Sequence, residues 1–265
     1  FVCGKGIYKS FVENYGSVDK FFPIDSYEFV FFFEKNNKVL KKFLENFDLI
    51  YAFCDRKEIL GINLEENFTK EIIFHPIIKE LNIHISDYLL QPIKNYFSKI
   101  EEIYRIKIDN KGKFYVIHPG SGNKSKNWNR ENFLQLSKKL ENVKILLGPA
   151  EEEEIYFWKE NFKGEILINP SFDTIIEIAK ETITYIGNDS GITHLFSITG
   201  VETIAIFGPT SPFIWGPKGE NVKIIHKKVG CSPCKKEKMK QCKERKCLNS
   251  ITIEDIITFL SKEKS

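Results

Sequence analysis

The chain has 265 residues, of which 42% are hydrophobic and 28% charged, and a formal net charge of +3. This composition is ordinary for a folded globular protein, and a charge so close to balance argues neither for nor against nucleic-acid binding. No run approaches the roughly 18 apolar residues of a membrane-spanning helix and no signal peptide is visible, so we expect a cytoplasmic protein.

The first part of the chain alternates strand-like and helix-like segments. Apolar runs predict strands at residues 2–3, 28–33 and 47–53. Continuous runs of this kind are typical of strands buried on both faces of a parallel sheet. The periodicity predicts a helix over residues 37–46 and a mostly helical segment over residues 71–103, interrupted by prolines. No sharp chemical motif lies in this part.

A short polar stretch at residues 109–113 is typical of a linker and predicts a domain boundary. Beyond it the alternation of strands and helices is clearer. Strands are predicted at residues 114–117, 143–147, 166–168, 183–186 and 203–207. Helices are predicted between them, and Thr252 with Asp255 resembles a capping box that opens a final helix. The pattern predicts a doubly wound parallel sheet, which is a Rossmann-like domain.

A polar turn follows one of these strands, in the stretch NDSGITHL. Asp189 and Ser190 are good N-cap residues, and Gly191 allows a tight turn at the start of the helix. Ser190 and His194 are four residues apart, so they share one helix face. Ligands of open α/β sheets bind at the ends of strands, so these residues predict a site for an anionic, hydroxyl-rich ligand. A plain helix cap would use the same residues.

A second polar loop, HPGSGNKSKNW over residues 118–128, also follows a predicted strand. Its glycines allow backbone N–H groups to approach phosphate oxygens, and its lysines supply mobile positive charge. The alternative is a solvated turn. The loop matches neither the Walker pattern nor GxGxxG, which argues against a P-loop NTPase and a dinucleotide dehydrogenase.

Four of the six cysteines crowd one segment, residues 231–247: Cys231, Cys234, Cys242 and Cys247. Four thiolates can hold a structural zinc ion, although the gap between the two pairs is shorter than in the usual zinc patterns. The same cysteines could instead form disulfides or stay as free thiols. Lysines surround the segment: Lys227, Lys228, Lys235, Lys236, Lys238, Lys240 and Lys243. They form a basic surface suited to an acidic lipid headgroup, or simply a solvated loop.

Four motifs in order, HPGSG with K-x-W shortly after, LLGPAEE, NDSGITHL and FGPTSPFIWGP, resemble glycosyltransferase family 9. The similarity is to the C-terminal half of the ADP-heptose:lipopolysaccharide heptosyltransferases and covers roughly residues 114–256. It implies an α/β fold of GT-B architecture, with two Rossmann-like domains facing a cleft. Residues 1–109 are then the acceptor-side domain, and residues 110–265, including the Cys-rich segment, the nucleotide-sugar-binding domain.

The resemblance also implies roles for individual residues. The diphosphate would be held by Ser121, Gly122 and Lys126. The ribose hydroxyls would be bound by Glu151 or Glu152, between which periodicity cannot choose. The sugar and diphosphate would be surrounded by Asp189, Ser190, Gly191 and His194. Thr210–Pro212 would lie near the nucleotide or serve only as a rigid loop.

The implied reaction is inverting sugar transfer that requires no cofactor or metal. A general base deprotonates the acceptor hydroxyl, and Lys126 stabilises the leaving phosphate. In the family the base is an aspartate on a loop of the type SSLGD near the N-terminus, and no segment here matches it. The start FVCGKGIYK resembles the family's second strand. We therefore expect the N-terminal domain to lack its first strand-loop-helix unit, either because it lies upstream or because this member is shortened, and we name no catalytic residue.

The resulting hypothesis is a heptosyltransferase that moves heptose, or a related sugar, from ADP-heptose to a lipopolysaccharide core acceptor. It would act in the cytoplasm, with peripheral association at the inner face of the cytoplasmic membrane, and would bind no nucleic acid. One alternative is a non-catalytic sugar-nucleotide-binding protein, because the base loop is unmatched. Another is a nucleotide-sugar epimerase of the same architecture.

Overall fold

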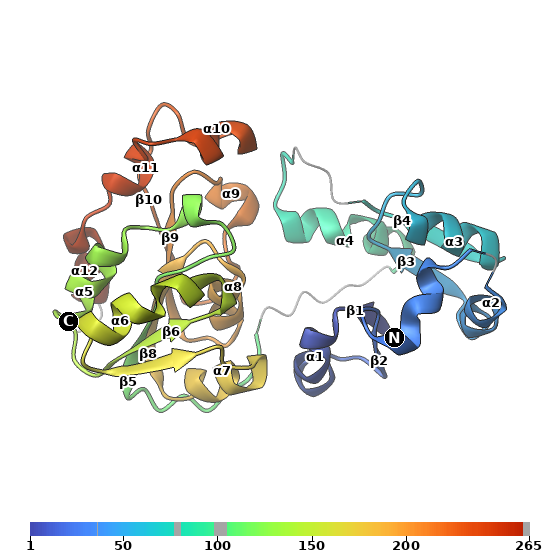
Figure 1. The fold of residues 1–265 in the computed structure, drawn as a ribbon, viewed down its shortest axis with the longest axis horizontal. Helices are drawn as coiled ribbons and strands as arrows, with labels where there is room; N and C mark the ends of the chain where they lie inside the picture. The colour runs from blue at the N-terminus through green and yellow to red at the C-terminus, as the bar shows by residue number, and fades with distance from the viewer. Residues whose placement is uncertain (36, 77–80, 98–104, 262–265) are drawn as a thin grey trace. The chain divides into compact units, whose positions relative to one another are not determined.

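The computed structural model describes residues 1–35, 37–76, 81–97 and 105–261. The chain forms two compact units, residues 1–101 and 102–265 (Figure 1). Each unit combines helices with parallel strands, so the predicted α/β class is confirmed. Within the described ranges, no helix has both the length and the apolar composition that a membrane crossing requires.

The N-terminal unit contains two separate pairs of parallel strands. One pair is β1 (Val2–Gly4) with β2 (Phe21–Pro23), and the other is β3 (Leu49–Ala52) with β4 (Glu71–Phe74). The helical segments are η1 (Gly6–Tyr8), α1 (Lys9–Tyr15), η2 (Tyr27–Phe33), α2 (Lys38–Leu44), α3 (Ile59–Asn67) and α4 (Ile85–Tyr96). A core of buried side chains, including Leu40, Leu44 and Leu64, packs beneath the strands.

Two predictions for this unit were wrong. The run at residues 28–33 forms the 3₁₀ helix η2 rather than a strand, and its Phe32 packs into the core against Phe43. An unbroken apolar run has no period, so it cannot distinguish a strand from a buried helical turn. Residues 71–103 were predicted to be mostly helical, yet they begin with strand β4, and α4 is the helix among the described residues of this segment. Residues 77–80 and 98–103 of the segment lie outside the described ranges.

The C-terminal unit is built on one six-stranded parallel sheet. Its strands are β5 (Phe114–His118), β6 (Val143–Leu147), β7 (Glu165–Ile168), β8 (Thr182–Asn188), β9 (Glu202–Phe207) and β10 (Val222–His226). They lie in the order β10-β9-β8-β5-β6-β7. Numbered from β5, this is the 3-2-1-4-5-6 order of a doubly wound sheet, so that prediction is confirmed. Sequence reasoning did not identify β10.

Helical segments connect and follow these strands. They are η3 (Lys124–Lys126), α5 (Arg130–Ser137), η4 (Pro149–Glu154), α6 (Ile155–Asn161), α7 (Phe172–Ala179), α8 (Gly191–Ile198), α9 (Pro212–Trp215), α10 (Lys236–Gln241), α11 (Lys246–Asn249) and α12 (Ile253–Ser261). The predicted capping box at α12 forms, because the Thr252 N–H donates to Asp255 Oδ2 at 2.8 Å and the Asp255 N–H donates to Thr252 Oγ1 at 3.2 Å. Fully buried Trp128, Phe133 and Trp158 anchor the core.

The strand order reverses between β5 and β8, which are neighbours in the sheet. In doubly wound sheets the crevice beyond the carboxyl ends of the strands at such a switch point is where ligands bind. The loops that follow β5 and β8 therefore define where the functional residues of this unit should gather.

Candidate functional site

An ion pair joins the two loops at the switch point. Lys126 Nζ lies 3.1 Å from Asp189 Oδ2, and the hydroxyl of Thr210, beyond β9, donates to the same oxygen at 2.6 Å. The Asp189 side chain is 7% exposed and that of Lys126 22%. The carboxylate is thus enclosed, while the lysine retains access to solvent. The enclosed Asp189 carboxylate thus holds Lys126 and Thr210, which come from separate loops.

A buried network centred on His118 lies at the end of β5. His118 Nδ1 lies 3.2 Å from the Tyr185 hydroxyl and 3.3 Å from Ser190 Oγ, and both hydroxyls also contact Thr193 Oγ1 at 3.0 Å. Burial raises the pKa of the Tyr185 hydroxyl well above its ordinary value, so this group stays protonated. The network links β5 to β8 and to the first turn of α8.

The other ring nitrogen of His118 reaches Glu151, one of the two glutamates proposed for the ribose. His118 Nε2 lies 3.3 Å from Glu151 Oε2, and the Gly148 N–H donates to the same oxygen at 2.8 Å. Glu151 is buried and its Oε1 has no hydrogen-bond partner in the part of the chain that the structure describes. Glu152 is exposed. The fold thus distinguishes two glutamates that the sequence could not.

Gly120 is required by this arrangement. A Cβ atom on Gly120 would lie 1.8 Å from Glu151 Oε1, an overlap that only the absence of a side chain avoids. The backbone of the loop therefore lies directly against the carboxylate.

Asn188, the last residue of β8, fastens the loop after β5. Its side chain accepts from the Trp128 N–H at 2.8 Å and donates to the Pro119 carbonyl at 2.7 Å, so both ends of the loop are held. Within the loop, the Ser121 hydroxyl donates to the Asn123 carbonyl at 2.9 Å and to Asn127 Oδ1 at 2.5 Å. The side chain of Ser121 therefore shapes the loop, which leaves backbone groups to face a ligand.

The remaining predicted residues lie around α8 and the tip of the loop. Ser190 caps α8 by accepting from the Thr193 N–H at 3.3 Å. A Cβ atom on Gly122 or Gly191 would meet no described atom within 4 Å, so the backbone at both glycines borders open space. His194 is half-buried in the first turn of α8.

Most of the side chains predicted to bind a ligand make contacts at the switch point, but not all of them do. Hydrogen bonds or ion pairs tie Lys126, Asp189, Ser190 and Glu151 to the loops after β5 and β8. Glu152, which is exposed, is the one predicted glutamate that the fold leaves outside this network of described contacts.

The Cys-rich segment contacts the loop after β5 and the loop after β9 through hydrogen bonds to their backbone. Its Ser232 hydroxyl donates to the Gly208 carbonyl at 2.6 Å and its Cys234 N–H to the Pro209 carbonyl at 2.7 Å, which supports the turn leading to Thr210. At its other end, the Arg245 guanidinium donates to the carbonyls of Lys124 and Asn127, on either side of Lys126. The segment therefore helps to hold two partners of Asp189.

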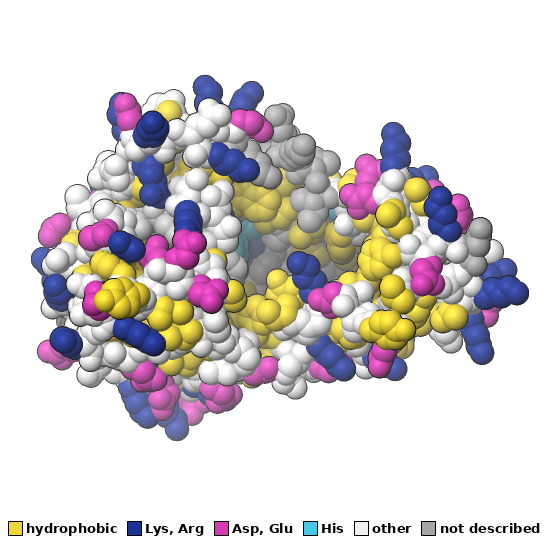
Figure 2. Space-filling model, viewed as in Figure 1, with side chains coloured by type: hydrophobic (Ala, Val, Ile, Leu, Met, Phe, Trp, Pro, Cys, Tyr) yellow, Lys and Arg dark blue, Asp and Glu magenta, His cyan; other side chains and the backbone are white. Residues whose placement is uncertain are grey.

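The thiols of this segment are free in the structure. Cys247 is buried beside Leu248 in the core, Cys234 is half-buried, and Cys231 and Cys242 are exposed. Across the described residues, no three His, Cys, Asp or Glu side chains are grouped so that they could hold a metal ion. Lys and Arg side chains project around α10 in the face shown in Figure 2. The zinc site remains a prediction of the sequence.

Several residues of this site were not selected from the sequence. His118, Tyr185, Asn188 and Thr193 all lie in the network, and each is buried. For His118 and Asn188 the only indication was position, since each is a polar residue ending an apolar strand. Tyr185 and Thr193 resemble ordinary core and helix residues, and only the packing of β8 on α8 places their hydroxyls together.

The arrangement is chemically suited to an anion with polar neighbours. A partly exposed ammonium, the N–H groups at the start of α8 and two loop glycines offer positive potential and donors. A carboxylate and a set of hydroxyls lie beside them. Asp189 Oδ2 already accepts from Lys126 and Thr210, so this oxygen holds together residues of two loops.

Comparison with known proteins finds a family match over the residues that form this site. Residues 76–246 match the family model for glycosyltransferase family 9 (heptosyltransferase). Lipooligosaccharide heptosyltransferase 2 of Campylobacter jejuni serotype O:2 is 29% identical over 246 residues, covering 82% of this chain and 75% of that protein.

Two solved structures share the fold at low sequence identity. One is the E. coli heptosyltransferase WaaC with ADP, with a TM-score of 0.65, 13% identity and coverage of 98% of this chain and 88% of that one. The other is the E. coli ADP-heptose lps heptosyltransferase II, with a TM-score of 0.68, 13% identity and coverage of 99% and 89%. The predicted likeness to GT-B glycosyltransferases is confirmed.

The zinc prediction can be checked by metal analysis of anaerobically purified protein. A tetrathiolate at Cys231, Cys234, Cys242 and Cys247 requires about one zinc ion per chain, and Cys234→Ser should remove most of it because a structural site needs all its ligands. Cys54→Ser, in the other unit, is the control. Zinc-free protein with four titratable thiols in the segment would contradict the prediction.

Proposed function

The chain belongs to glycosyltransferase family 9, the heptosyltransferase family, and we propose that it transfers heptose from ADP-heptose to a lipopolysaccharide core acceptor with inversion at the anomeric carbon. The observation that carries this proposal is the pairing of Lys126 with Asp189 across the switch point, beside the start of α8. Positive charge and N–H donors are the groups that bind a sugar diphosphate, and their presence together at this point supports the proposal.

The diphosphate lies between the loop after β5 and the start of α8. Lys126 supplies the charge, and its pairing with Asp189 holds the ammonium in one place before the ligand arrives. The backbone at Gly122 and Gly191 borders open space, so phosphate oxygens can approach the N–H groups closely. Ser121 contributes through the shape of the loop, and His194 lies on the face of α8 that carries Ser190.

The ribose is assigned to Glu151 rather than Glu152. A buried carboxylate oxygen without a partner is costly, and a ribose hydroxyl donating to Glu151 Oε1 would satisfy it. Adenine as the base is supported by analogy, since the structure of a relative with the same fold contains ADP and another relative is described as an ADP-heptose enzyme.

In the reaction, the acceptor hydroxyl attacks the anomeric carbon as the bond to the diphosphate breaks, and ADP leaves. Charge grows on the leaving phosphate, where Lys126 and the α8 N–H groups stabilise it more in the transition state than in the ground state. These groups supply positive charge that a metal ion provides in other transferases, so we propose that no cofactor is required. The proton of the acceptor goes to a base outside this network.

The proposed roles of the two units follow from where these residues lie. Every residue of the proposed donor site belongs to the C-terminal unit, so residues 110–265 are proposed as the donor domain and residues 1–109 as the acceptor domain. The acceptor is a lipid, and the basic surface around the Cys-rich segment suits peripheral contact with acidic headgroups at the cytoplasmic face of the membrane. Nucleic acid is not proposed as a partner.

A transfer assay tests the function directly. With ADP-heptose and a lipopolysaccharide core acceptor, we expect ADP release together with an acceptor heavier by one heptose, detected by chromatography and mass spectrometry. Conversion of the donor without acceptor would instead identify an epimerase. Donor binding by calorimetry with neither reaction, in a chain extended to its gene start, would identify a sugar-nucleotide-binding protein.

Lys126→Ala should lower kcat by about 10²-fold, the loss typical of removing one group that stabilises developing charge. Lys124→Ala is a matched control two residues away, because Lys124 pairs with Glu153 at the surface. If both variants transfer heptose at the rate of the unchanged protein, Lys126 has no role in neutralising the leaving phosphate.

The two glutamates form a second matched pair. Glu151→Gln should weaken ADP binding by about tenfold or more, as expected for a lost hydrogen bond to a charged group. Glu152→Gln should change it less than about twofold. Calorimetry gives the affinities, and melting temperatures show whether either variant is destabilised. The opposite order of effects would assign the ribose to Glu152.

A further inference from the structure

His118 lies at the centre of the network at the switch point, and the proposed reaction gives it no role. It ends β5, is 3% exposed, and has polar partners at both ring nitrogens. Nε2 lies 3.3 Å from Glu151 Oε2. Nδ1 lies 3.2 Å from the Tyr185 hydroxyl and 3.3 Å from Ser190 Oγ. The ring therefore connects the carboxylate proposed for the ribose with the start of α8.

The hydroxyls beside Nδ1 are compatible with a nitrogen that carries no proton. The Thr193 hydroxyl donates to the Asn188 carbonyl, so toward other hydroxyls its oxygen can only accept. The hydroxyls of Tyr185 and Ser190 both lie 3.0 Å from that oxygen and within 3.3 Å of His118 Nδ1. Every contact is satisfied when one of these two hydroxyls donates to Nδ1 and the other to the Thr193 oxygen.

The carboxylate on the other side of the ring decides the tautomer. An ionised carboxylate only accepts hydrogen bonds, so the contact with Glu151 Oε2 requires a proton on Nε2 of His118. The opposite tautomer would direct the lone pair of Nε2 at a negatively charged oxygen. Because a neutral imidazole carries one N–H, that proton lies on Nε2 and leaves Nδ1 as an acceptor.

Two donors then meet at one oxygen of Glu151. They are the His118 Nε2–H and the Gly148 N–H, which donates to Oε2 at 2.8 Å. Rotation of the carboxylate would break both hydrogen bonds. The other oxygen, Oε1, is buried and has no partner among the described residues. His118 thus helps to determine which oxygen of Glu151 is left for a ligand.

We propose, on the basis of the ribose assignment in the proposed function, that His118 is a positioning residue that makes the donor site selective for ribose. Protonated on Nε2, it holds Glu151 Oε2 and keeps Oε1 as a fixed acceptor. A nucleotide without ribose hydroxyls leaves this buried oxygen unsatisfied and binds more weakly. The same ring contacts Ser190, the N-cap of α8, so one side chain supports the binding of both the ribose and the diphosphate.

Other roles for His118 fit the contacts less well. Both nitrogens are already in hydrogen-bond contact with protein groups, and the ring is buried, so neither nitrogen is placed to take a proton from an acceptor hydroxyl. A purely structural role would weaken the binding of all ligands of the site to a similar degree. Selectivity for ribose is therefore the property that distinguishes the proposal.

Two nucleotides that differ only in their ribose hydroxyls test this selectivity. ADP and 2′,3′-dideoxy-ADP are titrated into the full chain by calorimetry. The unchanged protein should bind ADP about tenfold or more tightly than the analogue, which lacks a hydrogen bond to a charged group. His118→Asn keeps a polar atom near the position of Nδ1 but loses the donor to Glu151, so the preference should fall to about threefold or less.

His118→Gln is the matched variant. Its longer side chain brings an amide N–H near the position of Nε2, so it should recover most of the preference for ADP. Inorganic pyrophosphate, which has no ribose, is the control ligand. Its affinity for His118→Asn should stay within about twofold of that for the unchanged protein, because the contacts of Lys126 and α8 remain.

Nitrogen NMR of the histidine rings checks the tautomer without a substitution, and so applies even if a variant fails to fold. The His118 signals, assigned through contacts of its ring with that of Tyr185, should show a proton on Nε2 and none on Nδ1. A proton on Nδ1 would overturn the proposal.

The nucleotide titrations also separate this proposal from the function on which it rests. Equal binding of ADP and the analogue by the unchanged protein would show that the ribose assignment itself is wrong, and the role of His118 would fall with it. If the unchanged protein prefers ADP and His118→Asn prefers it as strongly, the ribose assignment stands and the positioning role is refuted. An equal loss of affinity for ADP, the analogue and pyrophosphate in His118→Asn would identify a purely structural residue.

Discussion

The site in the C-terminal unit depends on one enclosed carboxylate. Asp189 receives Lys126 from the loop after β5 and Thr210 from the loop after β9, so three separate loops meet at one oxygen. Removing Lys126 would leave the enclosed Asp189 carboxylate without compensation for its charge, which is destabilising. The pair thus fixes Lys126 in space, and a cation held before the ligand arrives is more useful for catalysis than one that must be ordered in the transition state.

Supporting contacts reach this pair from two directions. On the inside, His118 connects the glutamate in η4 to the hydroxyls of Tyr185 and Ser190, so the first turn of α8 is tied to two strands. On the outside, the Cys-rich segment contacts the backbone on both sides of Lys126 and the turn before Thr210. The Cys-rich segment therefore has a structural role that is independent of its thiols, because its hydrogen bonds position the loops that carry Lys126 and Thr210.

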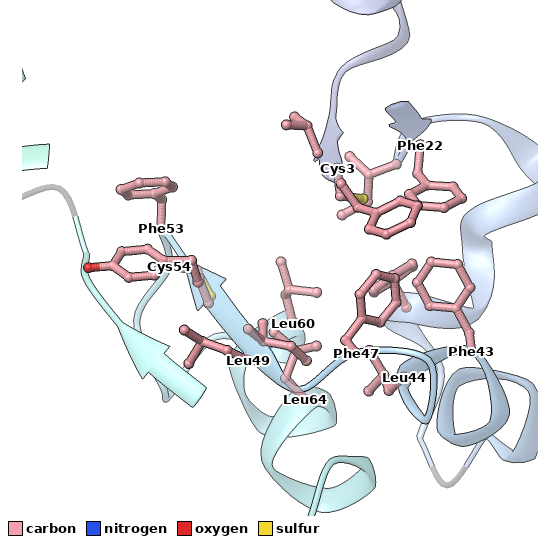
Figure 3. A pocket seen from close by; sticks show the side chains of 17 residues that line it. Cys3, Phe22, Phe43, Leu44, Phe47, Leu49, Phe53, Cys54, Leu60 and Leu64 are labelled. Atoms are coloured by element: carbon pink, nitrogen blue, oxygen red, sulfur yellow. The ribbon is translucent and has the colours of Figure 1, made fainter. Parts of the chain in front are cut away.

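The two units combine helices with parallel strands in different sheets. In the C-terminal unit, β5 fills the central position, and the site forms at its carboxyl end. In the N-terminal unit, the strands form two separate pairs, β1 with β2 and β3 with β4, and an apolar cavity is lined by residues of β1 and β3 (Figure 3).

The sequence by itself determined the α/β class, the five predicted strands of the C-terminal sheet and the two loops that meet at its switch point. These rest on local periodicity, caps and glycines, which short windows of sequence contain. It failed at η2, because an unbroken apolar run has no period, and it could not choose between Glu151 and Glu152, because both lie in one helical turn. Only the tertiary structure decided that choice, turning one carboxylate toward His118 and Gly120 and the other toward solvent. Tyr185, Thr193 and the cavity beside β1 likewise exist as features only once distant segments pack together, since hydrogen bonds and sheet edges are properties of pairs rather than of single positions.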